Sequence, residues 1–289
     1  MPSIKEVKNR IGSVQSTQQL TKAMKMVAAA KLKRAQDKVL QLRPYSKKLN
    51  EVLSNLSDSV NNDLFASREI NNYLIVFIGS DKGLCGGFNS SIIKLFNSFS
   101  ESSNLNHDSI NILPIGKKPY DFFKKSKYNV IDSYWNLLNG FNYENASEIF
   151  DFILSEFNES KYDKVSIIYN EFKNVAVQKS VIEDYLPIIK SNDGEDENSK
   201  SSNTNFIFEP DKSKIINNLI PQTLKTQLFK AVLESSASEQ GSRMTAMSQA
   251  TDNAGELLKE LRLTYNRTRQ AAITKEILEI VGGAEALNK

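Results

Sequence analysis

The fold is decided by the stretch MSQATDNAGELLKELRLTYNRTRQAAITKEILEIV, residues 247–281, which contains a single glycine and no proline. Its small and apolar residues recur at intervals of three and four, the spacing of a coiled-coil seam. They are Met247, Ala250, Ala254, Leu257, Leu261, Thr264, Thr268, Ala271 and Leu278, with Lys275 as the exception. Helix breakers are rare back to Asp211. We therefore expect a C-terminal coiled-coil segment over 211–287, with Gly282–Gly283 ending its long helix.

A second helical segment, residues 1–57, carries the same kind of repeat. Its apolar members are Ile4, Val7, Ile11, Val14, Ala28, Leu32, Ala35, Val39 and Leu42. The register places Gln18, Thr21 and Lys25 on the seam between the two apolar groups, so the middle of this stripe is polar or small. Pro44 should kink this helix or end it, and the apolar residues beyond it favour a kink.

The lengths of the two helices predict how they are arranged. One enters and the other leaves the middle of the chain, so a pair formed from them is antiparallel. A helix of about 70 residues is roughly 105 Å long, and a compact chain of this size has a radius of gyration of about 19 Å. The pair should therefore project, with the longer C-terminal helix extending beyond it. We expect another protein to cover the apolar end, 271–281.

The middle of the chain, 70–209, alternates strand and helix patterns, which is typical of a mostly parallel, Rossmann-like α/β domain. The expected strands are Tyr73–Gly79, Asn111–Ile115, a weaker Val130–Trp135, Val165–Phe172 and Val175–Ile182, and Phe206–Phe208 is a further candidate. The expected helices are Asn89–Phe99, Pro119–Lys125 and Asn145–Phe157. The acidic segment Ser191–Asn205 has no apolar residue and is expected to be a mobile loop. The fold class is thus α/β plus a long antiparallel coiled coil.

Composition excludes several classes of protein. Residues 1–50 carry a net charge of +10 and the remainder −7, so a basic arm precedes an acidic body. One cysteine, Cys85, excludes an intrachain disulfide, and with one histidine, His107, it leaves no zinc ligand set. No catalytic triad or dyad can be assembled from these residues, and no cofactor is implied. No apolar run is long enough to cross a bilayer, and the first residues do not read as a secretory signal.

Two features admit a binding function or a structural one. The loop Gly79–Gly87 follows a strand and precedes a helix, as phosphate-binding loops do, but it matches no phosphate-binding motif. A tight turn that needs glycine is the alternative. The basic arm could bind nucleic acid, although residues 1–44 contain no aromatic residue for base stacking. Its charges also suit an acidic protein surface.

Two further groups are ambiguous from spacing alone. Met24 and Met26 precede a run of alanines, where they could form core or a surface that repacks against changing partners. Arg267, Arg269 and Gln270 could offer paired donors to the carboxylates or carbonyls of another protein. The arginines could equally stabilise the end of the helix.

Motifs spread along nearly the whole chain resemble those of one family, the gamma subunits of F-type ATP synthases. They are Ile4–Ile11, Thr21–Lys31, Gly83–Gly87, Glu239–Met247, Ala250–Ala254, Tyr265–Thr274 and Glu276–Ala284. The resemblance implies a non-catalytic rotor shaft set in a ring of alpha and beta subunits. Its α/β foot would lie near the epsilon subunit and the membrane ring of c subunits. Rotation of that ring would turn the shaft and change the nucleotide affinity of the beta subunits.

The resemblance also implies roles for particular residues. Beta-subunit contacts correspond to Lys22, Met24, Lys25, Arg269, Gln270, Thr274 and Glu276. Contacts with the apolar collar of the alpha–beta ring correspond to Ile277, Leu278, Ile280 and Val281. No nucleic acid partner is implied, and association with the membrane would be peripheral, through the complex.

Two departures from the family pattern qualify these expectations. The 191–205 segment is more acidic than expected, and the cysteine pair of the chloroplast members, with its thiol switch, is absent. No transit peptide precedes Ile4, so we expect a bacterial type on the cytoplasmic face of the energy-transducing membrane. A basic coiled-coil nucleic-acid protein and a phosphate-binding α/β enzyme are the alternative classes.

Overall fold

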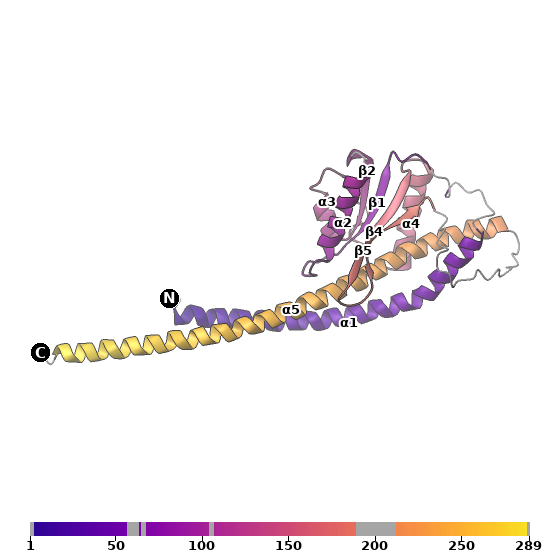
Figure 1. Ribbon diagram of the computed structural model, residues 1–289. Helices are drawn as coiled ribbons and strands as arrows, with labels where there is room; N and C mark the ends of the chain where they lie inside the picture. Colours follow the sequence, from indigo (N-terminus) through magenta and orange to yellow (C-terminus); the bar gives the residue numbers. More distant parts are fainter. Residues whose placement is uncertain (1–2, 57–63, 65–67, 104–106, 189–211, 288–289) are drawn as a thin grey trace. The chain divides into compact units, whose positions relative to one another are not determined.

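The computed structural model describes residues 3–56, 64, 68–103, 107–188 and 212–287 (Figure 1). The chain divides into two compact units. The first, called here the helix-pair unit, contains residues 1–29 and 243–289. The second, the α/β unit, contains residues 30–242. This division falls within the two long helices, whereas the sequence suggested segments 1–57, 70–209 and 211–287, and that three-part division stays a prediction. The expected strand Phe206–Phe208 and the 191–205 loop lie outside the described residues.

The two long helices have the predicted locations. Helix α1 covers Ile4–Leu56 and α5 covers Lys212–Leu287. A capping box sets the start of α1, because the Glu6 amide donates to Ser3 Oγ at 3.2 Å and the Ser3 amide donates to Glu6 Oε2 at 3.0 Å. Helix α1 continues through Pro44, so the alternative that it ends there is wrong.

The expected end of α5 at Gly282–Gly283 is also wrong, because the helix runs on to Leu287. Two glycines weaken a helix by about 1 kcal/mol each. The alanine and leucine residues that follow them favour the helix, and α5 continues.

The described residues of the α/β unit contain one sheet of five strands in the order β3-β2-β1-β4-β5. The strands are β1 (Tyr73–Ile78), β2 (Ile110–Ile115), β3 (Asn129–Val130), β4 (Lys164–Phe172) and β5 (Gln178–Leu186). Pairing is parallel except between β4 and β5. All six residues of the central strand β1 are buried, as expected for a parallel strand covered on both faces. The predicted, mostly parallel α/β layer is confirmed.

Helices cover both faces of this sheet (Figure 1). Helix α2 (Phe88–Ser102) and the short α3 (Lys117–Phe123) pack on one face, where Phe77, Phe96 and Phe123 form a cluster of edge-to-face rings. Helix α4 (Tyr143–Asn158) packs on the other face, and residues 220–232 of α5 complete the same core. The helix that leaves the domain is therefore also part of its core.

Two strands differ from the prediction. Val130–Trp135 was expected as a strand, but β3 contains only Asn129 and Val130. The following chain leaves the sheet, and Trp135 stacks on Tyr120 with ring centroids 5.0 Å apart. Strand β5 begins at Gln178 rather than Val175. The Asn174 side chain accepts the amides of residues 176 and 177, so these residues form a turn instead of ladder pairs.

Candidate functional site

The helix-pair unit is joined along the predicted polar seam. The Thr251 hydroxyl lies 2.8 Å from that of Thr21, and Gln18 Nε2 donates to the Thr251 carbonyl at 3.4 Å. Nearby, Lys25 Nζ donates to Ser248 Oγ at 2.9 Å. Partner numbers fall along α5 as they rise along α1, so the pair is antiparallel. The expected seam positions of Gln18, Thr21 and Lys25 are confirmed by these contacts. On α5, Met247 and Ala254 are buried as expected, but the expectation for Ala250 and Leu257 is wrong by one residue, because Thr251 contacts Thr21 and Leu258 is buried instead.

The three α1 residues that the resemblance singles out lie beside this seam. Lys22 and Lys25 are exposed and Met24 is half-buried. Met26 is 62% exposed, so it does not belong to the core, whereas Ala28 is buried. Leu20 and Val27 are exposed apolar neighbours that the sequence reasoning missed. Their spacing of seven residues was the available signal, since it places both on one face away from the seam.

The corresponding α5 residues lie on an open helix surface. Arg269, Gln270, Thr274 and Glu276 are all exposed. The Thr274 hydroxyl donates to the Gln270 carbonyl at 3.0 Å, a bond within the helix. The side chains of the other three therefore extend from a regular helix into solvent, where another protein could bind them.

The end of α5 exposes a group of large apolar side chains. Every described side chain from 271 to 284 is exposed. Leu278 is 66% exposed and Ile280 is 67% exposed, and Ile273, Ile277 and Val281 are each exposed by about half or more. Isolated apolar residues on a surface are normal, but a cluster of five on two turns or so of helix indicates a site of protein contact. We call residues 273–281 the apolar tip.

The Gly79–Gly87 loop is held by packing and by internal hydrogen bonds. The Asn89 side chain donates to Ser80 Oγ at 2.7 Å and accepts the Ser80 amide at 3.2 Å. A Cβ on Gly79 would lie 2.6 Å from Cγ of Pro119, so only glycine fits there. On its other side, Ser242 of α5 donates to the Cys85 carbonyl at 2.7 Å. These contacts favour the structural turn over phosphate binding.

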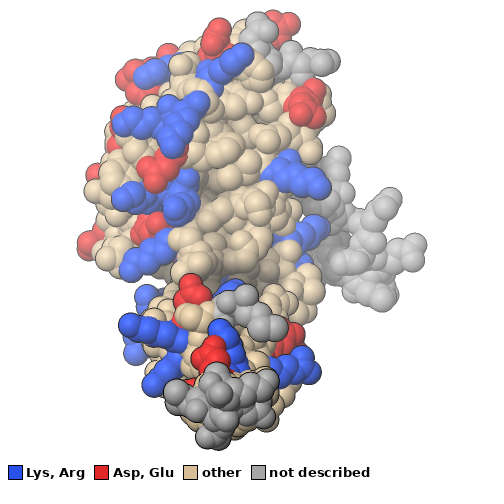
Figure 2. All heavy atoms as spheres, turned by 90° about the vertical axis from the view of Figure 1, so that its left-hand side faces the viewer, with Lys and Arg blue, Asp and Glu red and all other residues tan. Residues whose placement is uncertain are grey.

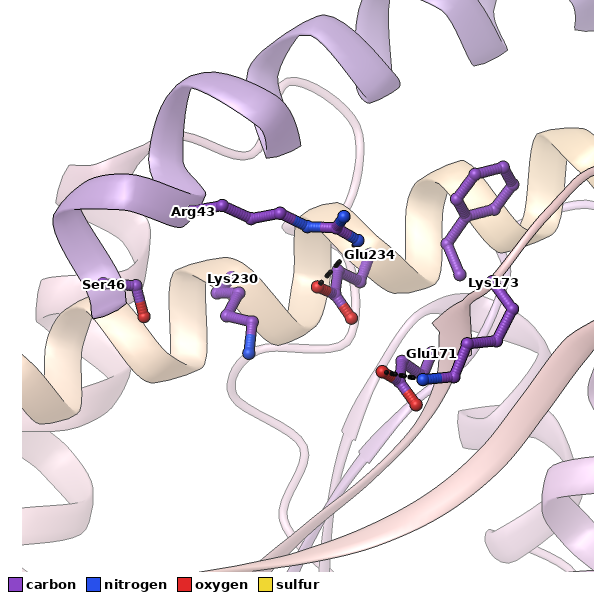
Figure 3. Close-up of a pocket in the computed structure, with 7 residues that line it drawn as sticks. Arg43, Ser46, Glu171, Lys173, Lys230 and Glu234 are labelled. Atoms are coloured by element: carbon purple, nitrogen blue, oxygen red, sulfur yellow. Dashed lines mark hydrogen bonds and ion pairs between the residues drawn. The ribbon is translucent and has the colours of Figure 1, made fainter. Parts of the chain in front are cut away.

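The α/β unit contains a polar cavity of about 510 Å³ that the sequence did not predict (Figure 3). Seven residues line it: Arg43, Ser46, Glu171, Phe172, Lys173, Lys230 and Glu234. Glu234 is buried, with one oxygen 3.9 Å from the Arg43 guanidinium. Burial raises the pKa of its carboxyl, and Lys230 and Arg43 oppose that shift. No local sequence signal distinguishes Glu234 from the other acids of α5, because its burial depends on β4 and on α1.

Charged side chains of both signs are interspersed on the visible surface of each unit (Figure 2). The basic residues of α1 that could contact nucleic acid, Lys22, Lys25, Lys31, Lys33, Arg34 and Lys38, are exposed. Within the described residues, no group of three or more His, Cys, Asp or Glu side chains could hold a metal ion. No described helix is long and apolar enough to span a membrane.

A pair of long helices with an exposed apolar tip, in a chain whose α/β unit uses its glycine loop for packing, defines a stalk-type subunit of a larger assembly. A family model described as ATP synthase matches residues 3–287. ATP synthase gamma chains of Amoebophilus asiaticus and Cytophaga hutchinsonii are 50% and 49% identical, over all of this chain and all of theirs. The chain belongs to the family of ATP synthase gamma chains, the non-catalytic central stalk subunits of the rotary F-type enzyme.

Solved structures agree with this fold. A chain in the central stalk and c-ring of Tetrahymena thermophila mitochondrial ATP synthase is 26% identical, with a TM-score of 0.56, covering 80% of this chain and 99% of that one. A chain from the Euglena gracilis mitochondrial enzyme reaches a TM-score of 0.69 at 22% identity, covering 98% and 94%. The predicted family, fold class and stalk function are confirmed.

Proposed function

We propose that this chain turns inside a ring of alpha and beta subunits and couples that rotation to ATP synthesis and hydrolysis in the beta subunits. The observation that carries the proposal is the apolar tip at the end of α5. A rotating axle needs a bearing that holds it without binding it in one orientation. Apolar contact is non-directional, so a ring of apolar side chains around Ile277, Leu278, Ile280 and Val281 would permit rotation.

The partners follow from the assemblies in which similar chains occur. The Tetrahymena structure is a central stalk with its c-ring, and the Euglena structure contains OSCP, F1 and the c-ring. By analogy, this chain would contact the alpha and beta subunits, the epsilon subunit and the c-ring. It would lie peripherally on the cytoplasmic face of the energy-transducing membrane.

The contacts with beta would differ between the two helices. Lys22 and Lys25 on α1 present ammonium groups beside the adaptable Met24, which suits an acidic surface whose shape changes during the cycle. On α5, Arg269 can hold a carboxylate with two parallel hydrogen bonds, and Gln270 can both donate and accept. Thr274 and Glu276 lie within the next two turns and would extend the same contact.

Coupling requires that these contacts differ among the beta conformations. A shaft can shift an equilibrium only by its difference in interaction free energy between the states. An antiparallel pair with one basic helix presents a different chemistry to each of three surrounding beta subunits. As the pair turns, each subunit would meet the Lys22–Lys25 face and the Arg269–Gln270 face in succession.

The test is rotation of this chain in a complex reconstituted with its own alpha and beta subunits. A probe attached to the α/β unit should turn in one direction during ATP hydrolysis. A variant with Ile277, Leu278, Ile280 and Val281 all changed to Ser should lose sustained rotation, while the purified chain keeps its melting temperature. Val177→Ser, which changes another exposed apolar residue in the α/β unit, is the matched control. Unaltered rotation of the four-residue variant would show that the apolar tip is not needed for rotation. Failure of the natural chain to assemble with its alpha and beta subunits would overturn the proposal itself.

A further inference from the structure

The polar seam of the helix-pair unit has a property that its apolar repeat lacks. Thr21 is buried between the helices, and its hydroxyl donates to the Gln18 carbonyl at 3.0 Å. The Thr251 hydroxyl similarly lies 2.7 Å from the Met247 carbonyl of its own helix. Each hydroxyl thus has an acceptor within its own helix. The Thr251 hydroxyl can instead donate its one proton to Thr21 Oγ1 at 2.8 Å, which forms a hydrogen bond across the seam that neither helix needs by itself. It depends only on how the two helices are aligned.

Gly255 favours the same alignment of the two helices for a steric reason. A Cβ at this position would lie 3.0 Å from Nε2 of Gln18. The absent side chain leaves room for Gln18 to cross the seam and reach the Thr251 carbonyl. Displacing one helix by a heptad would bring Ser248 or Arg262 opposite Gln18 in place of the glycine. It would also bring Met244 or Leu258 opposite Thr21.

The apolar part of the seam does not distinguish these alignments. Small and aliphatic residues recur every seven positions on both helices, so a displacement of one heptad, roughly 10 Å along the axis, still sets apolar against apolar. A polar residue at a seam position is the known means by which coiled coils select one register, at some cost in stability.

We propose that Gln18, Thr21, Thr251 and Gly255 form a register lock, which fixes the axial alignment of α1 against α5. They are positioning residues. The lock fixes the positions of Lys25 and Arg269 relative to one another along the axis of the helix pair. That these axial positions matter for coupling rests on the proposed function. The existence of the lock does not depend on that function.

Disulfide trapping in the purified full-length chain reads the register directly. Counting one heptad from the Thr21–Thr251 pair places Val14 opposite Leu258. A displacement of one heptad places it opposite Tyr265. Val14→Cys with Leu258→Cys therefore reports the native register, and Val14→Cys with Tyr265→Cys reports the displaced one. The native Cys85 is buried in the α/β unit and stays in place.

The lock is removed by Gln18→Leu, Thr21→Val and Thr251→Val together. An interhelical hydrogen bond of ordinary strength changes an equilibrium by roughly twofold to tenfold, and two are lost. We expect the ratio of displaced to native cross-link to rise by about tenfold. The matched control is Gln19→Leu, Thr17→Val and Thr264→Val, which makes the same changes at exposed positions. Equal ratios in the triple variant and its control would overturn the proposal.

Gly255→Ala tests the lock from its steric side and favours the helix, so it guards against loss of folding in the triple variant. The added Cβ should displace the Gln18 side chain and raise the cross-link ratio by roughly twofold. An unchanged cross-link ratio in Gly255→Ala would show that Gly255 does not contribute to the lock. In the whole enzyme, reconstituted into sealed vesicles with its c-ring and membrane sector, the triple variant should pump fewer protons per ATP than its control. If the cross-links shift and coupling does not, the lock stands and the proposed function loses support.

Discussion

The helix-pair unit buries some of its smallest side chains, whereas the α/β unit buries its largest. Ala28, Thr21 and Ala254 are buried between the helices, while Leu263 and Leu278 are exposed. In the α/β unit, by contrast, Phe77, Phe96 and Phe123 are almost completely buried. The α/β unit supplies its own apolar partners. The exposed surface of the helix pair resembles one half of an interface whose other half belongs to another protein.

The largest expected effect is loss of a core ring in the α/β unit. Phe77→Ala should lower the free energy of unfolding by about 3–5 kcal/mol, because Phe77 is buried against the rings of Phe96 and Phe123. Leu278→Ala at the tip should change it by less than about 0.5 kcal/mol. Urea denaturation of the purified chain measures both. Similar losses for the two variants would contradict the comparison.

A second prediction concerns the glycine turn. Gly79→Ala should destabilise the α/β unit by about 1–3 kcal/mol, because the new Cβ would clash with the Pro119 ring. Gly12→Ala is the control, since nothing lies within 4 Å of a Cβ there, and the helix should gain about 1 kcal/mol. The melting temperatures should therefore move in opposite directions. A neutral Gly79→Ala would show that the turn is not tightly packed.

A third prediction uses the buried Glu234, which interacts with Lys230 and Arg43 and, unfavourably, with Glu171 and Glu183. Its pKa is raised in the folded chain, so the folded state binds this proton more tightly than the unfolded state does. Stability should fall as pH rises from the ordinary carboxyl value through the raised pKa, and then level off.

Glu234→Gln should lack that part of the pH dependence. The difference in melting temperature between the natural chain and the variant, measured from pH 4 to 8, isolates this contribution. A difference that does not vary with pH would show that Glu234 titrates as an ordinary surface acid.

The smallest effect on stability belongs to the exposed contact residues. Arg269→Ala and Gln270→Ala should each change the free energy of unfolding by less than about 0.5 kcal/mol. Both should lower ATP turnover or coupling in the reconstituted complex. Glu256→Gln, another exposed position on α5, should change neither. A large drop in the stability of the purified Arg269 variant would mean that its role lies within the chain.

The sequence predicted features that depend on local periodicity. The buried run Tyr73–Ile78 could only be a covered strand, and the seam positions of Gln18 and Thr21 followed from heptad counting. Features that depend on distant partners were not predictable. Trp135 left the sheet because Tyr120 stacks against it. Glu234 is buried because α1 and β4 cover it. The exposure of Met26 became clear only once the seam had a definite orientation.

The core of the α/β unit has a consequence for the synthesis of this protein. One sheet face is completed by Ile220, Leu224 and Leu228, which follow all five of the described strands in the chain. Until those residues leave the ribosome, the apolar face formed by β1, β4 and α4 has no cover. Chains that stall or are cleaved before residue 220 would expose this face and should be recognised by chaperones and proteases. Completion of the α/β unit therefore requires the first turns of α5, through residue 232, to have been made and released.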